Sequence, residues 1–361
     1  MKTDHSSLQS NAPVLTRVKI ERPRPYLKMI RENGFMIMDM HVHTRFSDSF
    51  TRISKLIRRA DKLQIGLAIT DHNEIKGVLR AFQIKKHVPI IPGIEISIAE
   101  GPHILVYFAK LEALIHFYEK HVKNNKTRDP HSNTDLTIAQ LMRAKQKYEC
   151  LVSIAHPYSP SYTNVPKNIQ KGFIDPSVLD QADAVEVLNG AVTRKKNQKA
   201  VAFAQLLGKG ITGGSDSHSL FETGKVVTYT PAQTIREFLQ SIKRQDNFVL
   251  GKPIGKVKRM PSLAKSSHKH ILYFFPTITQ RYEQVVARNI RYHKPIITRK
   301  MNNLKNGGLE FLKQPLLVKR RLQPMRIHGS ESKIRQFWEY RKMKKRRALA
   351  IASAYKKSNS T

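Results

Sequence analysis

The stretch from Met36 to His43, which reads MIMDMHVH, decides the fold of this sequence. Its apolar first half predicts a buried strand whose last residues turn polar. Because side chains alternate across a strand, Asp39, His41 and His43 are expected on one face and the two intervening residues on the other. Two imidazoles about 7 Å apart along a strand end can converge on one metal ion. Ordinary surface or hydrogen-bonded histidines are the alternative, so the rest of the chain must decide.

Working outward from this stretch, strand and helix patterns alternate along the chain. The expected strands cover residues 36–43, 66–70, 88–95, 103–108, 151–155, 184–188, 211–214, 226–230 and 248–251. The expected helices cover residues 54–64, 75–87, 137–148, 197–207 and 234–244. This alternation predicts parallel strands with crossover helices. Polar residues follow many strands, and there is no glycine-rich dinucleotide fingerprint, so a closed (β/α) barrel is favoured over an open sheet.

The composition fits a barrel-sized domain with an appendage, since the chain has 361 residues and is 40% hydrophobic. The single cysteine, Cys150, excludes an internal disulfide framework and fits a reducing compartment. No apolar run approaches the roughly 18 residues of a membrane-spanning helix, and the polar first residues do not resemble a signal peptide. We therefore expect a soluble, cytoplasmic protein.

The charge is strongly basic and uneven. The net charge is +37, and residues 251–361 contain 28 lysines and arginines against 4 acidic residues. We expect a loose N-terminal arm over residues 1–35, a barrel over residues 36–251 and a basic extension, partly disordered or helical, over residues 252–361. Such a balance suits polyanions, namely RNA, DNA or an anionic membrane surface. A solvated, partly disordered extension is the alternative.

A basic helix is expected in this extension, over residues 330–357. It places Phe337 and Trp338 beside a run of lysines and arginines. Aromatic and basic side chains together can stack on bases and pair with phosphates. The same pattern suits an interfacial helix on anionic lipid, or a helix docked on the barrel with its charges in water.

Nine side chains that are good ligands for zinc, manganese or iron stand at the ends of expected strands or in the loops that follow them. They are His41, His43, Asp48, His72, Glu95, His103, His156, Asp216 and His218. A barrel concentrates its chemistry at the carboxyl ends of its strands, so these residues are expected to form one metal centre.

The same residues carry a resemblance to a known family. The chain resembles the polymerase and histidinol phosphatase (PHP) superfamily in its compact form, without a large insertion domain. The matching motifs run in order over residues 36–251 and are His41-Val42-His43, Thr70-Asp71-His72, Pro92-Gly93-Ile94-Glu95, His103, Ala155-His156-Pro157 and Gly214-Ser215-Asp216-Ser217-His218. The resemblance implies a distorted (β/α)7 TIM-like barrel with a trinuclear metal centre that hydrolyses phosphate esters.

The resemblance also implies how the ligands divide among two or three divalent ions. His41, His43, Glu95 and Asp216 would surround the first ion, Glu95 would bridge to a second held by His103 and His156, and Asp48, His72 and His218 would hold the third. Open positions would hold a metal-bridging hydroxide and the phosphate oxygens, so Glu95, Asp216 and His218 would act in catalysis through the metals. The general acid is not assigned.

Residues around this centre have weaker signals. Asp39 and Asp71 could orient ligand imidazoles, or could cap strand ends and turns. Arg45 could contact a substrate phosphate or be solvated. The basic residues 194–196 could form a phosphate clamp or begin a helix without a ligand.

The expected substrate is a phosphodiester or another nucleotide-like or nucleic-acid ester, brought near by the basic extension. A small-molecule monoester of the histidinol phosphate type is the alternative among enzymes. A barrel that binds nucleic acid without catalysis is the alternative from another class, although the complete ligand series argues against it.

Overall fold

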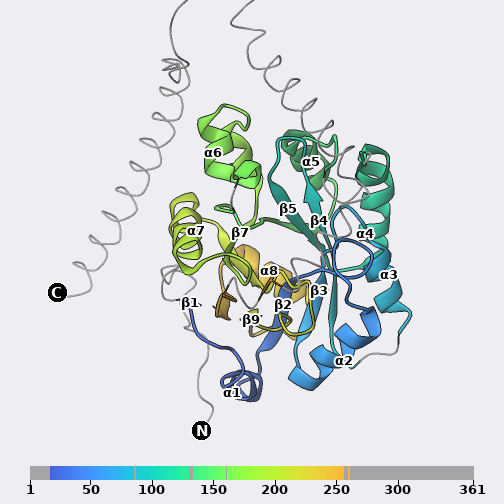
Figure 1. The fold of residues 1–361 in the computed structure, drawn as a ribbon, viewed down its shortest axis with the longest axis vertical. Helices are drawn as coiled ribbons and strands as arrows, with labels where there is room; N and C mark the ends of the chain where they lie inside the picture. Colours follow the sequence, from blue (N-terminus) through green and yellow to red (C-terminus); the bar gives the residue numbers. More distant parts are fainter. Residues whose placement is uncertain are drawn as a thin grey trace, which may run out of the picture.

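The computed structural model describes residues 17–255 and 259–260, except for residues 85–86, 128, 130–132 and 160. In this part of the chain ten strands form one sheet, in the order β1-β10-β9-β2-β3-β4-β5-β6-β7-β8 (Figure 1). The strands are β1 (Val18–Lys19), β2 (Met36–Val42), β3 (Gly66–Ile69), β4 (Ile90–Ser97), β5 (His103–Phe108), β6 (Cys150–Ile154), β7 (Ala184–Asn189), β8 (Gly210–Gly214), β9 (Val226–Thr230) and β10 (Phe248–Gly251).

Helices connect most of these strands and lie outside the curved sheet, except the helix of residues 235–244, which lies near its centre (Figure 1). They are α1 (Leu27–Glu32), α2 (Ile53–Leu63), α3 (Lys76–Phe82), α4 (Leu111–Phe117), α5 (Ile138–Lys145), α6 (Val165–Gln170), α7 (Arg194–Leu207) and α8 (Ile235–Arg244). A π-helical turn (Tyr118–Val122) extends α4, and short 3-10 segments cover Lys123–Asn125, Ser161–Thr163 and Pro176–Gln181. All five predicted helices are present, with ends that differ by a few residues.

The sheet curls until its two distant parts meet. The His43 N–H donates to the Ser217 carbonyl over 3.0 Å, and the Ser217 N–H donates to the His41 carbonyl over 3.3 Å. The segment after β8 therefore pairs with β2, and the strands from β2 to β8 make the wall of a distorted barrel. This confirms the predicted barrel class.

The prediction that all strands are parallel is wrong for β5 and β9. β5 is antiparallel to both β4 and β6, and β9 is antiparallel to β2 and β10. Only residues 98–102 separate β4 from β5, and a parallel crossover needs a dozen or more residues. The chain must turn back, which brings His103, at the start of β5, next to the carboxyl end of β4.

The second half of the expected N-terminal arm is part of the fold, so the prediction of a loose arm is wrong for residues 17–35. β1 pairs in parallel with β10, where Val18 lies opposite Val249. In α1, Leu27 and Ile30 are buried in the outer core. Residues 1–16 lie outside the described part of the chain, as do most of the basic extension and its expected helix.

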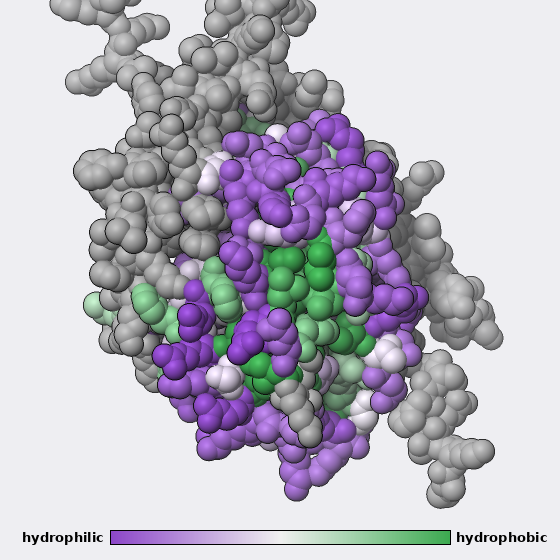
Figure 2. Space-filling model, turned by 90° about the vertical axis from the view of Figure 1, so that its right-hand side faces the viewer, coloured by the Kyte–Doolittle hydropathy of each residue, from purple (hydrophilic) through white to green (hydrophobic). Residues whose placement is uncertain are grey.

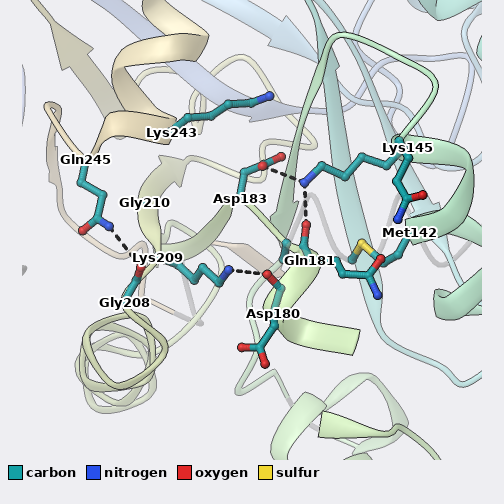
Figure 3. A pocket seen from close by; sticks show the side chains of 12 residues that line it. Met142, Lys145, Asp180, Gln181, Asp183, Gly208, Lys209, Gly210, Lys243 and Gln245 are labelled. Carbon is teal, nitrogen blue, oxygen red and sulfur yellow. Dashed lines mark hydrogen bonds and ion pairs between the residues drawn. The ribbon is translucent and has the colours of Figure 1, made fainter. Parts of the chain in front are cut away.

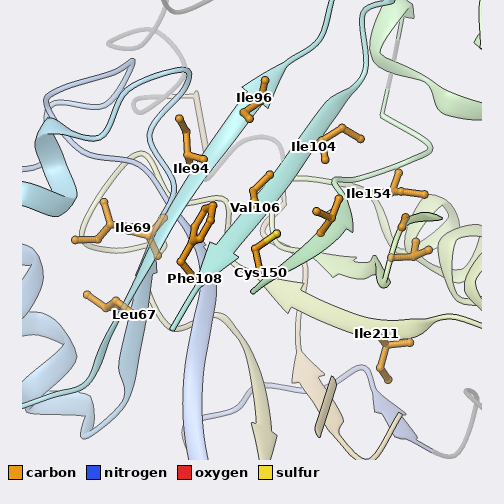
Figure 4. Close-up of a cluster of buried hydrophobic side chains, with 14 of the residues drawn as sticks. Leu67, Ile69, Ile94, Ile96, Ile104, Val106, Phe108, Cys150, Ile154 and Ile211 are labelled. Atoms are coloured by element: carbon orange, nitrogen blue, oxygen red, sulfur yellow. The ribbon is translucent and has the colours of Figure 1, made fainter. Parts of the chain in front are cut away.

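Two apolar layers hold the barrel. The outer layer fills the space between the sheet and the helices, and Figure 4 shows part of it, including Leu67, Ile94 and Phe108. The inner layer contains Met38, Met40, Leu105, Tyr107 and, from α8, Phe238. Hydrophobic residues also form a band on the face shown in Figure 2, between hydrophilic surroundings.

The predicted alternation of β2 does not hold to its end. Met40 belongs to the inner layer, whereas Val42 belongs to the outer one. The pairing of β2 with β3 shifts register between Asp39 and Val42, and such an irregularity changes the face to which later side chains point. His41 and His43 meet in the same cluster of ring nitrogens, as predicted, whereas Asp39 accepts hydrogen bonds from Ser215 and Gly224 instead.

Candidate metal centre

All nine predicted ligand residues lie together at one end of the barrel. They come from β2, β4, the start of β5 and the loops that follow β2, β3, β6 and β8. Their side chains are at most 14% exposed. The structure thus brings together residues that are up to 177 positions apart in the sequence, from His41 to His218.

Four of these side chains point their ligand atoms at one spot. His41 Nε2 lies 3.1 Å from both His43 Nε2 and Glu95 Oε2. His43 Nε2 lies 3.3 Å from both Glu95 Oε2 and Asp216 Oδ1, and His41 Nε2 lies 3.8 Å from Asp216 Oδ1. A tetrahedral ion with bonds of about 2.0–2.1 Å separates its ligand atoms by about 3.3 Å, so the atoms of His41, His43 and Glu95 fit around one ion, and Asp216 Oδ1 stands near both imidazoles.

The other oxygen of Glu95 faces a second pair of imidazoles. Glu95 Oε1 lies 3.1 Å from His103 Nδ1 and 3.1 Å from His156 Nε2. A carboxylate with one oxygen in each group can bridge two cations and reduce their mutual repulsion. This arrangement agrees with the expected grouping of these three residues.

The remaining three residues, Asp48, His72 and His218, do not form one compact group, because His72 lies farther from Asp48 than His218 does. Asp48 Oδ2 lies 2.7 Å from His218 Nε2 but 3.8 Å from His72 Nε2. His72 Nδ1 lies 3.3 Å from Glu95 Oε2, so His72 stands between the bridging carboxylate and Asp48. His43 also approaches this group, because its Nδ1 lies 3.5 Å from Asp48 Oδ1.

The chemistry of the donor set tests whether a metal fits. Within the described residues, His43 Nδ1, His103 Nε2 and His156 Nδ1 are buried without a hydrogen-bond partner, but these are the ring nitrogens opposite those that meet Glu95, so they do not decide the question. Nitrogen and oxygen donors of this kind suit zinc, manganese or iron, and the donor set fits divalent ions.

The close packing of imidazoles and carboxylates shifts the pKa values of the clustered side chains in both directions. Burial alone would lower the pKa of His43, but Asp48, Asp216 and Glu95 together raise that pKa to about 10. Burial lowers the pKa of His72 to about 3, because nearby positive imidazoles add to desolvation and outweigh Glu95 and Asp48. Burial raises the pKa values of the three ligand carboxylates, but the surrounding imidazoles bring all three well below their ordinary values. Ionised carboxylates at this depth attract cations.

The close approach of two strands explains one glycine of the last motif. A Cβ atom on Gly214 would lie 2.3–2.9 Å from the Cβ, N and Cα atoms of His41. Only glycine allows the end of β8 to lie this close to β2. Two residues later, Asp216 has a φ of 50°, an uncommon left-handed conformation for a residue that is not glycine. Such strain is often found where a side chain must be aimed at a site.

Glu186 is a functional candidate that the sequence reasoning missed. Its Oε1 accepts a hydrogen bond from His41 Nδ1 at 2.9 Å, and its Oε2 accepts from the His156 N–H at 2.8 Å and from Asn189 Nδ2 at 3.0 Å. It therefore orients two of the predicted ligands, as carboxylates often do around metal-binding imidazoles. The available signal was a charged residue in the middle of an otherwise apolar strand.

Asp39 and Asp71 do not orient imidazoles, so that prediction is wrong. Asp39 accepts hydrogen bonds from the Ser215 N–H at 2.8 Å, the Ser215 hydroxyl at 2.5 Å and the Gly224 N–H at 2.8 Å. Burial raises the pKa of Asp39 to about 6, against these hydrogen bonds. Asp71 accepts from the Thr44 N–H and from the hydroxyls of Thr44 and Ser47. Both carboxylates fix ligand-bearing loops, which is the alternative role.

Arg259 also stabilises the loop after β8. Its Nε donates to Glu222 Oε1 at 3.1 Å, and this ion pair is buried, with side chains 7% and 1% exposed. Glu222 Oε2 accepts from the His218 N–H at 2.7 Å, and an Arg259 guanidinium nitrogen donates to the Asp216 carbonyl at 3.3 Å. A residue of the basic extension thus holds the loop that carries two predicted ligands.

The predicted phosphate contacts lie outside the cluster. Arg45 is exposed, and its guanidinium lies 5.8 Å from the centre of the Phe46 ring. Arg194 and Lys195 are exposed in the first turn of α7, a position that fits a helix start without a ligand.

A cavity of about 440 Å³ lies at the opposite end of the barrel, near the starts of β7 and β8 (Figure 3). Lys145 donates there to Asp183 and to the Gln181 carbonyl, and Lys209 donates to the Asp180 carbonyl. These amines satisfy carbonyl and carboxylate groups of the chain itself. The cavity contains none of the nine predicted ligands and is therefore not the metal centre.

Solved structures with similar folds have low identity. PsfC from Pseudomonas syringae PB-5123 is 19% identical with a TM-score of 0.47, over 65% of this chain and 98% of that one. Endonuclease Q, bound to a 27-mer duplex substrate with an abasic lesion at the active site, is 17% identical with a TM-score of 0.49, over 62% and 61%. A proposed metal-dependent phosphoesterase from Bifidobacterium adolescentis is 17% identical with a TM-score of 0.40, over 62% and 98%.

The comparison of sequences is more decisive. No curated protein matches the chain. The profile of the PHP domain family, however, matches residues 39–249, more than half of the chain and a span that includes all nine predicted ligands. The chain therefore belongs to the PHP domain family.

Proposed function

We propose that this protein hydrolyses phosphodiester bonds in nucleotide or nucleic-acid substrates, at a three-metal centre held by the nine clustered residues. One observation carries the proposal, namely the ligand atoms of His41, His43 and Glu95, which converge at the spacing of a tetrahedral ion with Asp216 close to both imidazoles. The contacts of Glu95 Oε1 with His103 and His156 support a second ion, and the group around Asp48 and His218 supports a third.

The bound ions would neutralise phosphate oxygens and lower the pKa of water to supply the nucleophile. The protein residues have the task of holding the ligands rigid before substrate arrives. Glu186 holds His41 in the tautomer with its proton on Nδ1. The Nε2 lone pair is then directed at the ligand atoms of His43 and Glu95. Arg45, two residues beyond His43 and exposed outside the cluster, is assigned in this proposal to contact with a phosphate of the substrate.

The net charge of +37 supports a polyanionic substrate over a small monoester. The complete ligand series supports catalysis over binding alone. No helix among the described residues is long and apolar enough to cross a membrane. The expected basic helix lies outside those residues, and nothing here supports membrane contact. Nucleic-acid binding by the extension is part of this proposal, and a cytoplasmic location stays a prediction from the sequence.

The test compares turnover of bis-p-nitrophenyl phosphate and p-nitrophenyl phosphate by the purified chain. We expect the diester to be the better substrate, with two or three transition-metal ions per chain by elemental analysis. His43→Ala and Asp216→Ala should lose both metal and turnover, whereas His87→Ala, at an exposed position outside the cluster, should keep both. A stable, metal-free wild-type protein would reject the proposal, and a preference for the monoester would replace the diesterase with the alternative.

The role of the extension needs its own measurement. Removing the residues after Met260 keeps Arg259 and should leave diester turnover unchanged. It should weaken binding of single-stranded DNA or RNA and reduce the dependence of that affinity on salt, because phosphate contacts release counterions. Unchanged affinity and salt dependence would exclude a nucleic-acid role for the extension.

A further inference from the structure

A basic cavity lies beside the loop that carries the first ligands. It has a volume of about 260 Å³ and is lined by residues from that loop, from the start of α2 and from the end of α3. Three of the lining residues are arginines, namely Arg45, Arg52 and Arg80, and none of the lining residues is acidic. None of the nine clustered ligands lines it, so it is a separate site from the metal centre.

Two of the three arginines of this cavity, Arg52 and Arg80, have no carboxylate within 4.0 Å in the part of the chain that the structure describes. Arg80 donates to the neutral amide of Gln83 at 3.0 Å. Like charges gathered around one cavity repel each other, and an anion in the cavity would relieve that repulsion. Guanidinium groups also match phosphate in geometry, because they donate two parallel hydrogen bonds.

The N-terminus of α2 adds to the positive electrostatic potential of this cavity. The helix spans Ile53–Leu63, has no acidic residue in its first turn and has no side-chain cap. The first N–H groups of a helix have no acceptor within the helix and carry partial positive charge. Ile53 and Ser54 line the cavity, so these N–H groups and the Ser54 hydroxyl can assist the arginines.

The cavity is tied rigidly to the metal centre. The Thr44 N–H donates to Asp71 at 2.7 Å, and Ser49 donates to the His218 carbonyl at 2.9 Å, so both ends of the connecting loop are fixed. The same loop contributes Asp48 to the metal cluster. Phe46 lines the cavity, so one aromatic ring is available there to pack on a base.

From this juxtaposition, we propose that the arginine cavity binds a second, non-reacting phosphate of the substrate. The inference rests on the proposed function and narrows it, because the preferred substrate must then have at least two phosphates joined through a nucleoside. Oligonucleotides and terminally phosphorylated dinucleotides meet this requirement. A simple diester has only one phosphate and does not meet it.

The test compares a thymidine dinucleotide with and without phosphates on its two ends, each cleaved by the full-length chain. Arg52→Gln and Arg80→Gln should each raise KM for the phosphorylated dinucleotide about tenfold, since a charge-assisted hydrogen bond to phosphate is lost. The KM for the dinucleotide without terminal phosphates should change less than twofold, and kcat should change less than twofold for both. Arg58→Gln, an exposed change of the same kind on α2, is the matched control.

A second readout does not depend on turnover. Calorimetric titration with inorganic pyrophosphate should give a Kd at least fivefold weaker for Arg52→Gln/Arg80→Gln than for Arg58→Gln. Equal Kd values, or equal KM increases for both dinucleotides, would overturn the inference and leave the metal centre unaffected. A wild-type chain that cleaves no phosphodiester would instead overturn the proposed function, and the pyrophosphate titration would still decide whether the cavity binds phosphate.

Discussion

The sharpest test of the centre is Glu186→Gln, a change that preserves shape and removes one charge. Glu186 accepts three hydrogen bonds, from His41 Nδ1, the His156 N–H and Asn189 Nδ2. A glutamine amide has one acceptor oxygen, and its NH₂ group must face a donor. If the oxygen stays with His156 and Asn189, the NH₂ faces His41 Nδ1 and drives the proton to Nε2. His41 Nε2 would then be unable to bind a metal.

The size of the effect follows from these contacts. Replacing a carboxylate that orients a metal-binding imidazole costs about 10–100-fold in metal affinity. That range corresponds to about 1.4–2.8 kcal/mol of binding free energy. The alternative amide orientation leaves the His156 N–H without its partner, at a similar cost of about 1–3 kcal/mol.

Competition with a chromophoric chelator measures this change directly. We expect Glu186→Gln to lose metal at 10–100-fold lower chelator concentration than the wild-type protein, while Glu119→Gln, the same change at an exposed position, behaves as wild type. Thermal melts in EDTA show whether the metal-free fold survives the substitution. A folded Glu186→Gln chain with metal affinity within twofold of wild type would refute the role assigned to Glu186.

Three further outcomes are expected. EDTA should lower the Tm by about 5–10 °C for each ion that it removes, since an ion at 100 times its Kd contributes about 2.7 kcal/mol, and an unchanged Tm would contradict metal binding. Arg259→Met should lower the free energy of unfolding by about 3–5 kcal/mol, because Glu222 stays buried without its partner; Arg259→Lys should lose less, and equal melts for all three proteins would exclude the effect. Burial, with the nearby Asp183 charge, raises the pKa of Cys150 from 9.0 to about 12. The unfolded chain then releases this proton at lower pH than the folded chain, so the free energy of unfolding should fall as pH rises above about 9. A native thiol that reacts with Ellman's reagent at pH 8 as fast as the unfolded one would contradict this.

The ligands were predictable because the chemistry and the local pattern coincide. A strand that ends in histidine or aspartate can be recognised from a few neighbouring residues, and a barrel gathers such ends at one rim. His43 and His72, which follow β2 and β3, could be proposed as ligands in this way. The helix positions were equally accessible, since Leu56, Ile57 and Ala60 of α2 are buried at the spacing that the sequence shows.

The features that were missed depend on contacts distant in sequence. Glu186 and His41 are separated by 145 residues, and no local pattern of β7 says which side chain its carboxylate will meet. The register shift in β2 depends on pairing with β3, so it could not be read from β2 alone. The reversal of β5 was accessible in principle, because a five-residue connection is too short for a crossover.

The Arg259 ion pair bears on where the functional unit of this chain ends. The match to the family stops at residue 249, and the last strand of the described residues stops at Gly251. A chain shortened there would keep every predicted ligand, yet it would lose the guanidinium that holds Glu222 and the Asp216 carbonyl. Lost activity after such a cut would then be mistaken for evidence that the extension delivers substrate. The barrel and the first residues of the extension therefore form one structural unit, and a shortened chain has to keep Arg259 if the loop after β8 is to stay in place.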